Sequence, residues 1–458
     1  MLHAGDSPAP ANVARQQSMT NPNLRQFSRL IWEAALSAAN PVTCIRRFIE
    51  LNDKSISLAG RSFPINGRII VIGAGKASAQ MAQVVEQILG EHVAGGLVVT
   101  KYGHALPLER IRLIEAGHPI PDSAGVRAVQ QTRDLLKDLS EDDIVLCLIS
   151  GGGSALWPSP AEGITLDMKQ DVTQGLLRGG ASIRELNAVR KHLSEIKGGQ
   201  LARFAFPARV ISLIMSDVIG DPVDFIASGP MAPDTTSFSD ALAVVQKYGV
   251  DIPRAVFQRF EEGAHGRIPE TPKPGDTIFQ RVENHIIANN RLLVDAAVEK
   301  ARDLKFNTII VGTEIEGEAK EVGAFFAAMA REVGFSGNPI RQPACILAAG
   351  ETTVSVRGTG LGGRNQEMAL ACAIAMRSPV APACFASVAT DGTDGPTTAA
   401  GGLIDETTCA RGVALGLTPA KFLAANDSYH FLRATGDLII TGPTQTNLMD
   451  LQILLVSS

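Results

Sequence analysis

Short apolar runs, each followed by a turn and then by a helical pattern, constrain the fold of this chain most strongly. The first half of the chain contains four of them, at 68–72, 95–100, 144–149 and 210–215. They lack the alternation of apolar and polar residues that marks a strand with one face in water, so we expect strands covered on both faces. Helical patterns separate them, at 77–89, 124–139, 165–178 and 182–198. Strands and helices that alternate in this way predict an α/β fold with parallel sheets.

The same alternation resumes in the second half of the chain. Strand patterns lie there at 284–288, 308–311, 345–349, 384–389, 437–441 and 451–456. Helical patterns lie between them at 291–304, 318–333 and 365–376. At 458 residues with 45% apolar residues, the chain exceeds one ordinary hydrophobic core. We therefore predict two doubly wound α/β domains with largely parallel sheets and an active-site cleft between them.

Composition suggests where the two domains begin and end. Residues 251–280 combine proline, glycine and polar side chains, which is typical of a linker. We therefore predict an N-terminal domain over 23–250 and a C-terminal domain over 281–458. Residues 1–22 lack the apolar core of a signal peptide, and we expect a disordered or loosely attached segment there. The sequence leaves open whether the last strand packs back on the first domain.

Charge and cysteine usage indicate the class of partner. The chain has 42 basic and 47 acidic residues, a formal net charge of −5, and no basic block. Neither a nucleic acid nor an anionic membrane is therefore expected as a partner, and no apolar stretch reaches the roughly 20 residues that span a bilayer. The six cysteines are scattered without a C-x-x-C pair, which favours reduced thiols and a cytoplasmic protein. We expect small-molecule substrates, and the sequence leaves a homodimer open.

A run of three glycines follows the apolar run 144–149. In doubly wound sheets, ligands bind beyond the carboxyl ends of the strands, and the backbone N–H groups of a glycine turn at a helix start can hold an anion. A flexible surface loop is the simpler alternative, but it would not need so apolar a strand before it. We predict an anion site formed by Ser150, Gly151, Gly152, Gly153 and Ser154.

A second glycine turn, GAGK at 73–76, follows the run 68–72. It fits neither a dinucleotide fingerprint, which needs a third glycine where this chain has Ser78, nor a Walker loop, which needs glycine where it has Ile70. A tight strand-to-helix turn explains the glycines equally well. Lys76 favours a ligand, because a cation at a helix N-terminus opposes the helix dipole and a bound anion would relieve it. The candidate site residues of this turn are Gly73, Gly75 and Lys76.

Two aspartates follow the fourth apolar run. Asp217 lies where a carboxylate can accept a proton from a substrate hydroxyl or hold Mg²⁺. Asp221 precedes Pro222, where a helix cap is an equally simple explanation. We choose Asp217 as the catalytic carboxylate and keep both aspartates as candidate metal ligands. On the preceding helix, Arg190 and Lys191 are candidate anion contacts, although charges on a helix usually face water.

The second half carries a matching set of polar residues after its strands. Arg364 follows four glycines within six residues. A cationic fork on so flexible a segment suggests a phosphate contact that is completed when the domains close. Asp391 and Asp394 lie in the turn TDGTDG, which lacks the remaining ligands of a calcium loop. These two aspartates are turn residues or Mg²⁺ ligands.

Eight motifs occur in order along the chain from about residue 25. They read GAGKASA, LISGGGSALWPSP, IRELNAVRKHLSEIKGGQLA, SLIMSDVIGDPVDFIASGP, AAGETTV, GGRNQEMAL, ATDGTDGPTTAAGG and TGPTQTNLMDL. This series resembles the bacterial and animal glycerate 2-kinases of the MOFRL family over nearly the whole chain. One position departs from the family pattern, since Gln445 stands where the family has glycine, and this affects the geometry of the last turn rather than the chemistry.

The resemblance implies a Rossmann-like N-terminal domain and a C-terminal MOFRL domain in an enzyme that uses ATP and Mg²⁺. The implied reaction phosphorylates the 2-hydroxyl of D-glycerate in the cleft between the domains. By position, the resemblance implies catalytic roles for Lys76, Asp217 and Arg364. It also points to the glycine–serine loop and to the regions of Glu351 and Asp391 as surroundings of the nucleotide, metal or substrate. The remaining motif residues expected at the site are Gly363 and Asn365.

Two other functions stay open at this point. Members of the family have also carried the name hydroxypyruvate reductase, so an NAD(P)H-dependent reductase competes with the kinase. A non-catalytic protein that binds sugar acids is the other alternative. Ser78 counts against the reductase. Keeping the charged residues Lys76, Asp217 and Arg364 together costs free energy, which counts against a protein without catalysis. Because these residues are divided between the two halves, we also expect the halves to close on their ligands.

Overall fold

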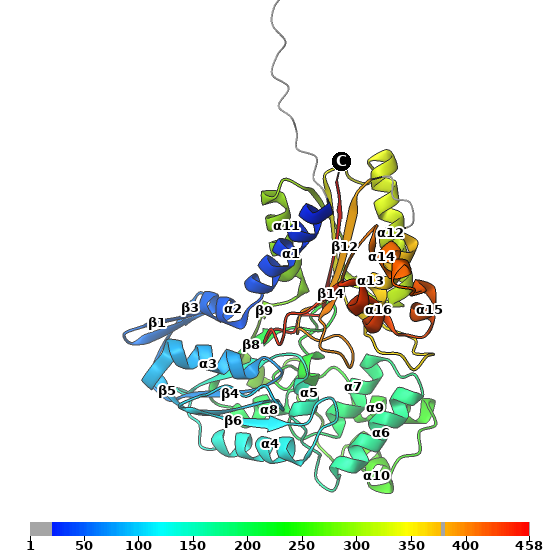
Figure 1. The fold of residues 1–458 in the computed structure, drawn as a ribbon. Helices are drawn as coiled ribbons and strands as arrows, with labels where there is room; N and C mark the ends of the chain where they lie inside the picture. The colour runs from blue at the N-terminus through cyan, green and yellow to red at the C-terminus, as the bar shows by residue number, and fades with distance from the viewer. Residues whose placement is uncertain (1–20, 377–380, 458) are drawn as a thin grey trace, which may run out of the picture.

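The computed structural model describes residues 21–376 and 381–457 of the chain. They form two α/β units, each built on a six-stranded sheet, which lie one above the other in Figure 1. The α/β class expected from the sequence is confirmed. Within the described ranges, no helix is both long and apolar enough to cross a membrane.

The first sheet is parallel throughout. Its strand order is β6 (Ile111–Ala116), β5 (Val93–Lys101), β4 (Ile69–Ala74), β7 (Ile144–Ile149), β8 (Arg209–Met215) and β9 (Val282–Ala288). Alternate residues of β4 enter two different cores: Ile69 and Val71 face one, and Ile70 and Ile72 face the other. The uninterrupted apolar runs are therefore buried on both faces of the sheet, as predicted.

Helices cover both faces of the first sheet. The helices of this unit are α3 (Ser78–Leu89), α4 (Ser123–Leu135), α5 (Gly153–Leu156), α6 (Leu166–Arg178), α7 (Ile183–His192), α8 (Gln200–Ala205), α9 (Phe238–Lys247) and α10 (Arg254–Ala264). Helix α7 begins at a capping box, in which Ser182 and Glu185 satisfy each other's backbone N–H groups. Helices α6, α7, α9 and α10 enclose a separate apolar core beside the sheet.

The second sheet is mixed, which differs from the predicted, largely parallel arrangement. Its strand order is β10 (Asn307–Ile315), β11 (Ala344–Gly350), β15 (Asp450–Val456), β12 (Ala383–Ala389), β13 (Gly401–Asp405) and β14 (Leu438–Ile439). Among the described strands of this sheet, only β10 and β11 pair in parallel, whereas β15 runs antiparallel to both of its neighbours. Parallel neighbours need a long crossover. The chain instead joins β12 to β13 through a short loop without a helix.

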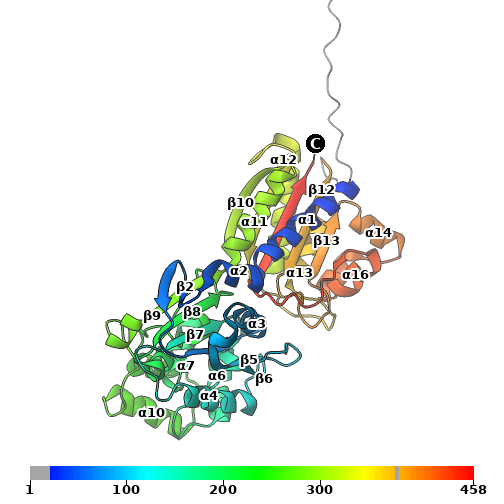
Figure 2. The same cartoon turned by 90° about the vertical axis from the view of Figure 1, so that its left-hand side faces the viewer.

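The helices of the second unit also lie on both faces of its sheet. They are α1 (Asn21–Ala38), α11 (Asn290–Asp303), α12 (Ala319–Ser336), α13 (Arg364–Ala375), α14 (Thr408–Ala414), α15 (Pro419–Ala424) and α16 (Ser428–Thr435). Figure 2 shows α1 and α11 across the face of the sheet that is turned to the viewer. Helix α1 buries Leu24, Ile31 and Ala35, a spacing that places them on one side of the helix.

The chain crosses between the two units twice, which revises the predicted boundaries. Helix α1 packs on the second sheet, and α2 (Pro41–Phe48) then leads through the small antiparallel sheet of β1 (Ile49–Asn52), β2 (Ser55–Leu58) and β3 (Arg61–Pro64) into the first unit. The predicted linker 251–280 contains α10, and β9 completes the first sheet instead of opening the second. The last strand lies in the centre of the second sheet. Of the segment expected to be disordered, 1–20 lies outside the described residues.

The two units share one continuous hydrophobic cluster. It runs from Val71 of the first sheet through Ile31 of α1 and Leu293 of α11 to Ile453 of the second sheet. The two crossings and this shared core join the two units. The ends of β4, β7 and β8 thereby face the turns around β12 and β15.

Candidate active site

The ends of β4 and β7 approach each other so closely that only glycine fits at two positions. A Cβ on Gly73 would lie 2.2 Å from the carbonyl oxygen of Leu148, and one on Gly75 would lie 2.0 Å from Ser150 Oγ. Ser150 Oγ accepts a hydrogen bond from the backbone N–H of Ala77 at 3.0 Å. Gly73, Gly75 and Ser150, predicted as phosphate contacts, are thus used in joining two strands to the start of a helix.

The triple-glycine loop leaves room for two polar side chains. A Cβ on Gly151 would lie 2.1 Å from Asp217 Oδ2 and 2.0 Å from Asn447 Nδ2. Gly152 has a φ of 83° and lies beside the ring of His118. The loop therefore needs glycine because charged and polar side chains from other elements occupy the space against its backbone.

Seven polar residues meet where the two units face each other, and we call them the interdomain cluster. They are Lys76, Asp217, Glu351, Arg364, Asp391, Asn447 and Asp450. Two contacts bridge the units: Lys76 Nζ lies 3.2 Å from Asp391 Oδ2, and Asn447 Nδ2 donates to Asp217 Oδ2 at 2.7 Å. The predicted residues Lys76, Asp217 and Asp391 are thus brought together.

Arg364 is held by carboxylates on all sides of its guanidinium. Its Nε and Nη2 contact the two oxygens of the buried Asp450 at 2.5 and 2.9 Å. Its Nη1 lies 3.0 Å from Glu351 Oε1. Arg364 therefore orients Glu351 and neutralises a buried charge, and its contact with phosphate stays a prediction.

Sequence reasoning missed Asn447 and Asp450 for a topological reason. In parallel sheets, ligands bind beyond the carboxyl ends of the strands. Because β15 is antiparallel to its neighbours, its amino end points to the interdomain cluster. The two residues lie just before and at the start of that strand. Both residues lie in the motif TGPTQTNLMDL, and this motif was the sequence signal that could have identified them.

Burial shifts the acid–base properties of the cluster. Burial raises the pKa of Asp217 above its ordinary value, although the nearby charge of Lys76 opposes this. Burial likewise raises the pKa of Glu351, with Arg364 opposing. Burial, together with the charges of Lys76 and Lys101, lowers the pKa of His118 to about 4. At neutral pH, Asp217 is therefore a stronger base than an exposed aspartate, and His118 is uncharged.

Two of the four predicted metal ligands are used elsewhere. Asp394 is buried and caps α13 by accepting hydrogen bonds from the backbone N–H groups of Asn365 and Gln366 at 3.1 and 2.9 Å. Asp221 accepts a hydrogen bond from Asn289 Nδ2 at 2.5 Å. Gly363 and Asn365, predicted to contact substrate, belong to the same helix start, and Asn365 is fully buried.

Asp217 and Asp391 remain as a donor set for Mg²⁺. Within 21–376 and 381–457, no three histidine, cysteine or acidic side chains are grouped as a complete metal site. Mg²⁺ usually binds through one or two carboxylates and takes further oxygens from substrate phosphates. Two carboxylates beside Lys76 therefore fit a Mg²⁺ ion that arrives with a polyphosphate.

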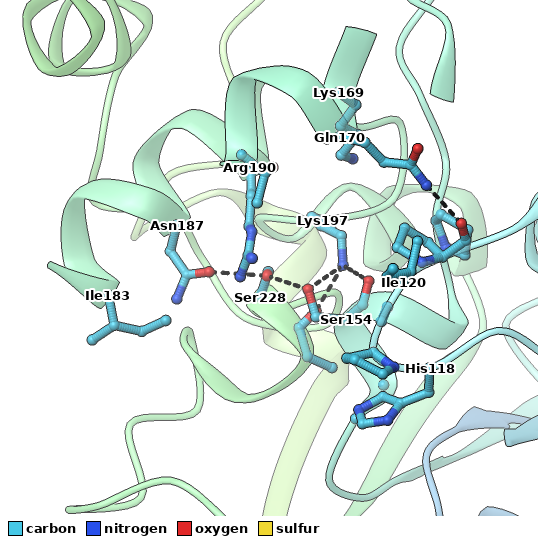
Figure 3. Close-up of a pocket in the computed structure, with 18 of the residues that line it drawn as sticks. His118, Ile120, Ser154, Lys169, Gln170, Ile183, Asn187, Arg190, Lys197 and Ser228 are labelled. Atoms are coloured by element: carbon cyan, nitrogen blue, oxygen red, sulfur yellow. Dashed lines mark hydrogen bonds between the residues drawn. The ribbon is translucent and has the colours of Figure 1, made fainter. Parts of the chain in front are cut away.

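Neighbouring cations on α7 have different surroundings. Lys191 is buried and paired with Asp234 and Asp224, at 3.1 and 3.2 Å, so it holds the fold together. Arg190 lines a pocket of about 590 Å³ in the first unit. Ser154 lies in the same pocket, where its hydroxyl accepts a hydrogen bond from Lys197 Nζ at 2.9 Å (Figure 3).

Known proteins match most of this chain. A family model described as a domain of unknown function matches residues 27–261, and the model of the MOFRL family matches residues 344–450. The D-glycerate 2-kinase of Thermotoga maritima is 44% identical over 390 residues, which cover 85% of this chain and 91% of that protein. The chain belongs to the MOFRL family of glycerate kinases.

Other members of this MOFRL glycerate kinase family agree with the assignment. The glycerate 2-kinase of Pyrococcus horikoshii is 40% identical over 433 residues, which cover 94% of this chain and 96% of that protein. The crystal structure of the glycerate kinase from Thermotoga maritima matches with a TM-score of 0.85 and 40% identity, covering 95% of this chain and 100% of that chain. The fold described above is therefore the fold of the family.

Proposed function

We propose that this protein is a glycerate 2-kinase, which transfers the γ-phosphoryl group of ATP to the 2-hydroxyl of D-glycerate. The products are 2-phosphoglycerate and ADP. One observation carries the proposal: a cation, Lys76, and a buried carboxylate of raised pKa, Asp217, are neighbours in a chain that is 44% identical to a D-glycerate 2-kinase. Phosphoryl transfer needs these two chemical functions.

Asp217 is the general base of the proposed mechanism. It accepts the proton of the 2-hydroxyl while the hydroxyl oxygen forms a bond to the γ-phosphorus. The bond from that phosphorus to the bridging oxygen breaks, and the electron pair leaves with ADP. The raised pKa of Asp217 supports this role, because a base whose pKa lies closer to the working pH transfers protons more effectively. The hydrogen bond from Asn447 fixes the orientation of the carboxylate.

Lys76 supplies positive charge where the transferred group gains negative charge. A preorganised cation stabilises the transition state more than the ground state, because it needs no reorganisation during the reaction. Asp391 holds the ammonium group in position from the opposite unit. Asp391 is the residue that would hold Mg²⁺, which would neutralise charge on the nucleotide phosphates, so that Asp217 stays free to accept the proton.

Arg364 has a positioning role in this account. Its two bonds to Asp450 leave one edge of the guanidinium for Glu351. The charges of Asp217 and Lys76 act on the pKa of Glu351, so Glu351 lies within electrostatic reach of both proposed reaction residues. Arg364 thus acts on the reaction through Glu351 rather than by touching phosphate.

The reductase alternative receives no support from the glycine turn at 73–76. Ser78 occupies the place of the third glycine, and its hydroxyl oxygen lies within hydrogen-bond distance of the carbonyl oxygens of Gly75 and Val99, at 2.8 and 2.7 Å. The third glycine of a dinucleotide fingerprint allows close packing of the helix against the strand, and here a serine side chain fills that place.

A paired assay tests the proposed function. The purified protein is incubated with D-glycerate, ATP and Mg²⁺ while ADP release is followed, and separately with hydroxypyruvate and NADH while NADH loss is followed. We expect ADP release that depends on D-glycerate, and no NADH oxidation above the background. NADH oxidation without glycerate-dependent ADP release would contradict the proposal.

A further inference from the structure

The pocket of about 590 Å³ in the first unit is continuous with the interdomain cluster. It lies between α5, α6, α7 and the loop that contains His118. At one end its wall includes Asp217 and Gly152, which belong to the proposed reaction centre or adjoin it. A ligand in this pocket can therefore present one of its ends to Asp217.

Three cations line this pocket without a carboxylate partner in the part of the chain that the structure describes (Figure 3). Arg190 makes no hydrogen bond or ion pair with any of the residues that the structure describes. Lys169 is only 7% exposed, and its Nζ has no hydrogen-bond partner among those residues. Lys197 Nζ donates to Ser154 and to the carbonyl oxygen of Ala227, which are neutral acceptors. The neighbouring Lys191 shows the contrast, because two aspartates neutralise it.

The unpaired cations of the pocket lower one another's pKa values. Burial, with the charges of Arg190 and Arg259, lowers the pKa of Lys169 to about 7. Burial, with the charges of Lys169 and Arg190, lowers the pKa of Lys197 well below its ordinary value. Buried cations are normally paired, because an unpaired charge away from water is costly. An anion with several oxygens would supply the missing partners.

The rim of the same pocket is apolar. Ile120, Leu177 and Ile183 all line it and are 65%, 57% and 56% exposed. Exposed large apolar side chains around a pocket mark a surface that a ligand covers. The pocket thus combines a cationic interior with an apolar rim that suits a flat aromatic ring.

We propose that this pocket binds the nucleotide: the phosphates contact Arg190, Lys169 and Lys197, the adenine ring covers the apolar rim, and the terminal phosphate faces Asp217. The inference rests on the proposed function and adds to it the domain and the residues that hold ATP. Glycerate is far too small to fill a pocket of about 590 Å³, whereas pockets of roughly 300–1,000 Å³ are typical for ligands of nucleotide size. Glycerate then binds on the side of Lys76.

Direct binding to the full chain tests this inference. Dissociation constants for ADP, adenosine and D-glycerate are measured by titration calorimetry. For Arg190→Met we expect ADP to bind about tenfold more weakly or worse, the scale of one lost charge-assisted hydrogen bond, with adenosine and glycerate little changed. For Ile183→Glu, at an exposed position where folding is not at risk, we expect weaker binding of both ADP and adenosine.

Two control variants outside the pocket test whether a change of surface charge alone alters the affinity for ADP. Arg254→Met removes an exposed arginine of α10, and Val413→Glu adds a carboxylate on an exposed apolar position of α14. Both should bind ADP as the unaltered protein does. Unchanged ADP affinity in both pocket variants, or a loss of glycerate affinity in place of ADP affinity, would overturn the inference.

The binding and activity measurements together distinguish a failure of the nucleotide pocket from a failure of the proposed function. A protein that loses ADP affinity in this pattern, yet does not phosphorylate glycerate, would contradict the proposed function and support the nucleotide pocket. A protein that forms 2-phosphoglycerate with ADP affinity unaltered in both variants would support the function and overturn the pocket.

Discussion

At the scale of single residues, the charge of Lys76 is the feature that the mechanism depends on most. Lys76→Met keeps the length of the side chain and removes the charge next to Asp391. We expect kcat to fall roughly 100- to 1,000-fold, as for the loss of one preorganised group at a developing anion. Steady-state kinetics and a thermal melt measure the effect. Lys54→Met, at an exposed position, should keep both kcat and stability, and an unchanged kcat in folded Lys76→Met would refute the role of Lys76.

The raised pKa of Asp217 predicts how kcat depends on pH. Its pKa is raised in the folded protein by burial, so the proton-accepting form is lost as the pH falls through that raised value. The acid limb of kcat should therefore lie at higher pH than the pKa of roughly 3.9 of an ordinary aspartate. Asp217→Asn should lower kcat about 100-fold or more and remove this limb.

The comparison for Asp217→Asn is the exposed variant Asp53→Asn, whose pH profile should match that of the unaltered protein. The Michaelis constant for glycerate should change less than kcat in Asp217→Asn, because the shape of the side chain is kept. If only that Michaelis constant rises, Asp217 binds substrate and is not the base.

Which individual residues could be predicted depends on what surrounds them. Lys76 and Asp217 could be found because they directly follow buried strands of a parallel sheet. Arg190 and Lys191 could not be told apart, since only the fold shows that Asp234 and Asp224 lie opposite one of them. Gly73 and Gly75 carried a signal for close approach, but the sequence could not tell whether a ligand or another strand makes that approach.

At the scale of secondary-structure elements, two adjacent glycines of β5 have opposite surroundings. A Cβ on Gly96 would lie 2.2 Å from the carbonyl oxygen of Val71 on the neighbouring strand, whereas a Cβ on Gly95 would meet nothing within 4 Å. We expect Gly96→Ala to lower the free energy of unfolding by about 1–3 kcal/mol through overpacking. Gly95→Ala should leave that free energy unchanged or raise it by about 0.5 kcal/mol. Denaturant unfolding of both variants checks this, and equal stabilities would contradict the described packing.

Strand and helix positions were predictable where burial on both faces produces an uninterrupted apolar run, as in β7. Strand β13 was missed, because its short sequence GGLID carries little apolar signal. Strand direction in the second sheet was also beyond the sequence pattern. A buried central strand such as β15 looks the same whichever way it runs, and only the connections around it decide its direction.

At the scale of the whole molecule, we expect the two units to close on their ligands. Few polar contacts bridge the units within the interdomain cluster, and the pair of Lys76 and Asp391 is partly exposed, so open forms cost little energy. Nucleotide and glycerate together should favour the closed form, since their charged groups then meet side chains of both units in the interdomain cluster. Small-angle scattering should show the smallest radius of gyration with glycerate and a non-hydrolysable ATP analogue both bound. Identical radii with and without bound ligands would mean that the units form a rigid site.

In the proposed function, the interdomain cluster transfers the phosphoryl group to the 2-oxygen of glycerate with Asp217 as the base. Phosphorus and carbon NMR of the product formed from D-glycerate, ATP and Mg²⁺ identifies the oxygen that receives the group. We expect phosphate on the 2-oxygen, and we expect this product to disappear with Asp217→Asn. Phosphate on the 3-oxygen, or undiminished 2-phosphoglycerate in the folded Asp217→Asn variant, would contradict it.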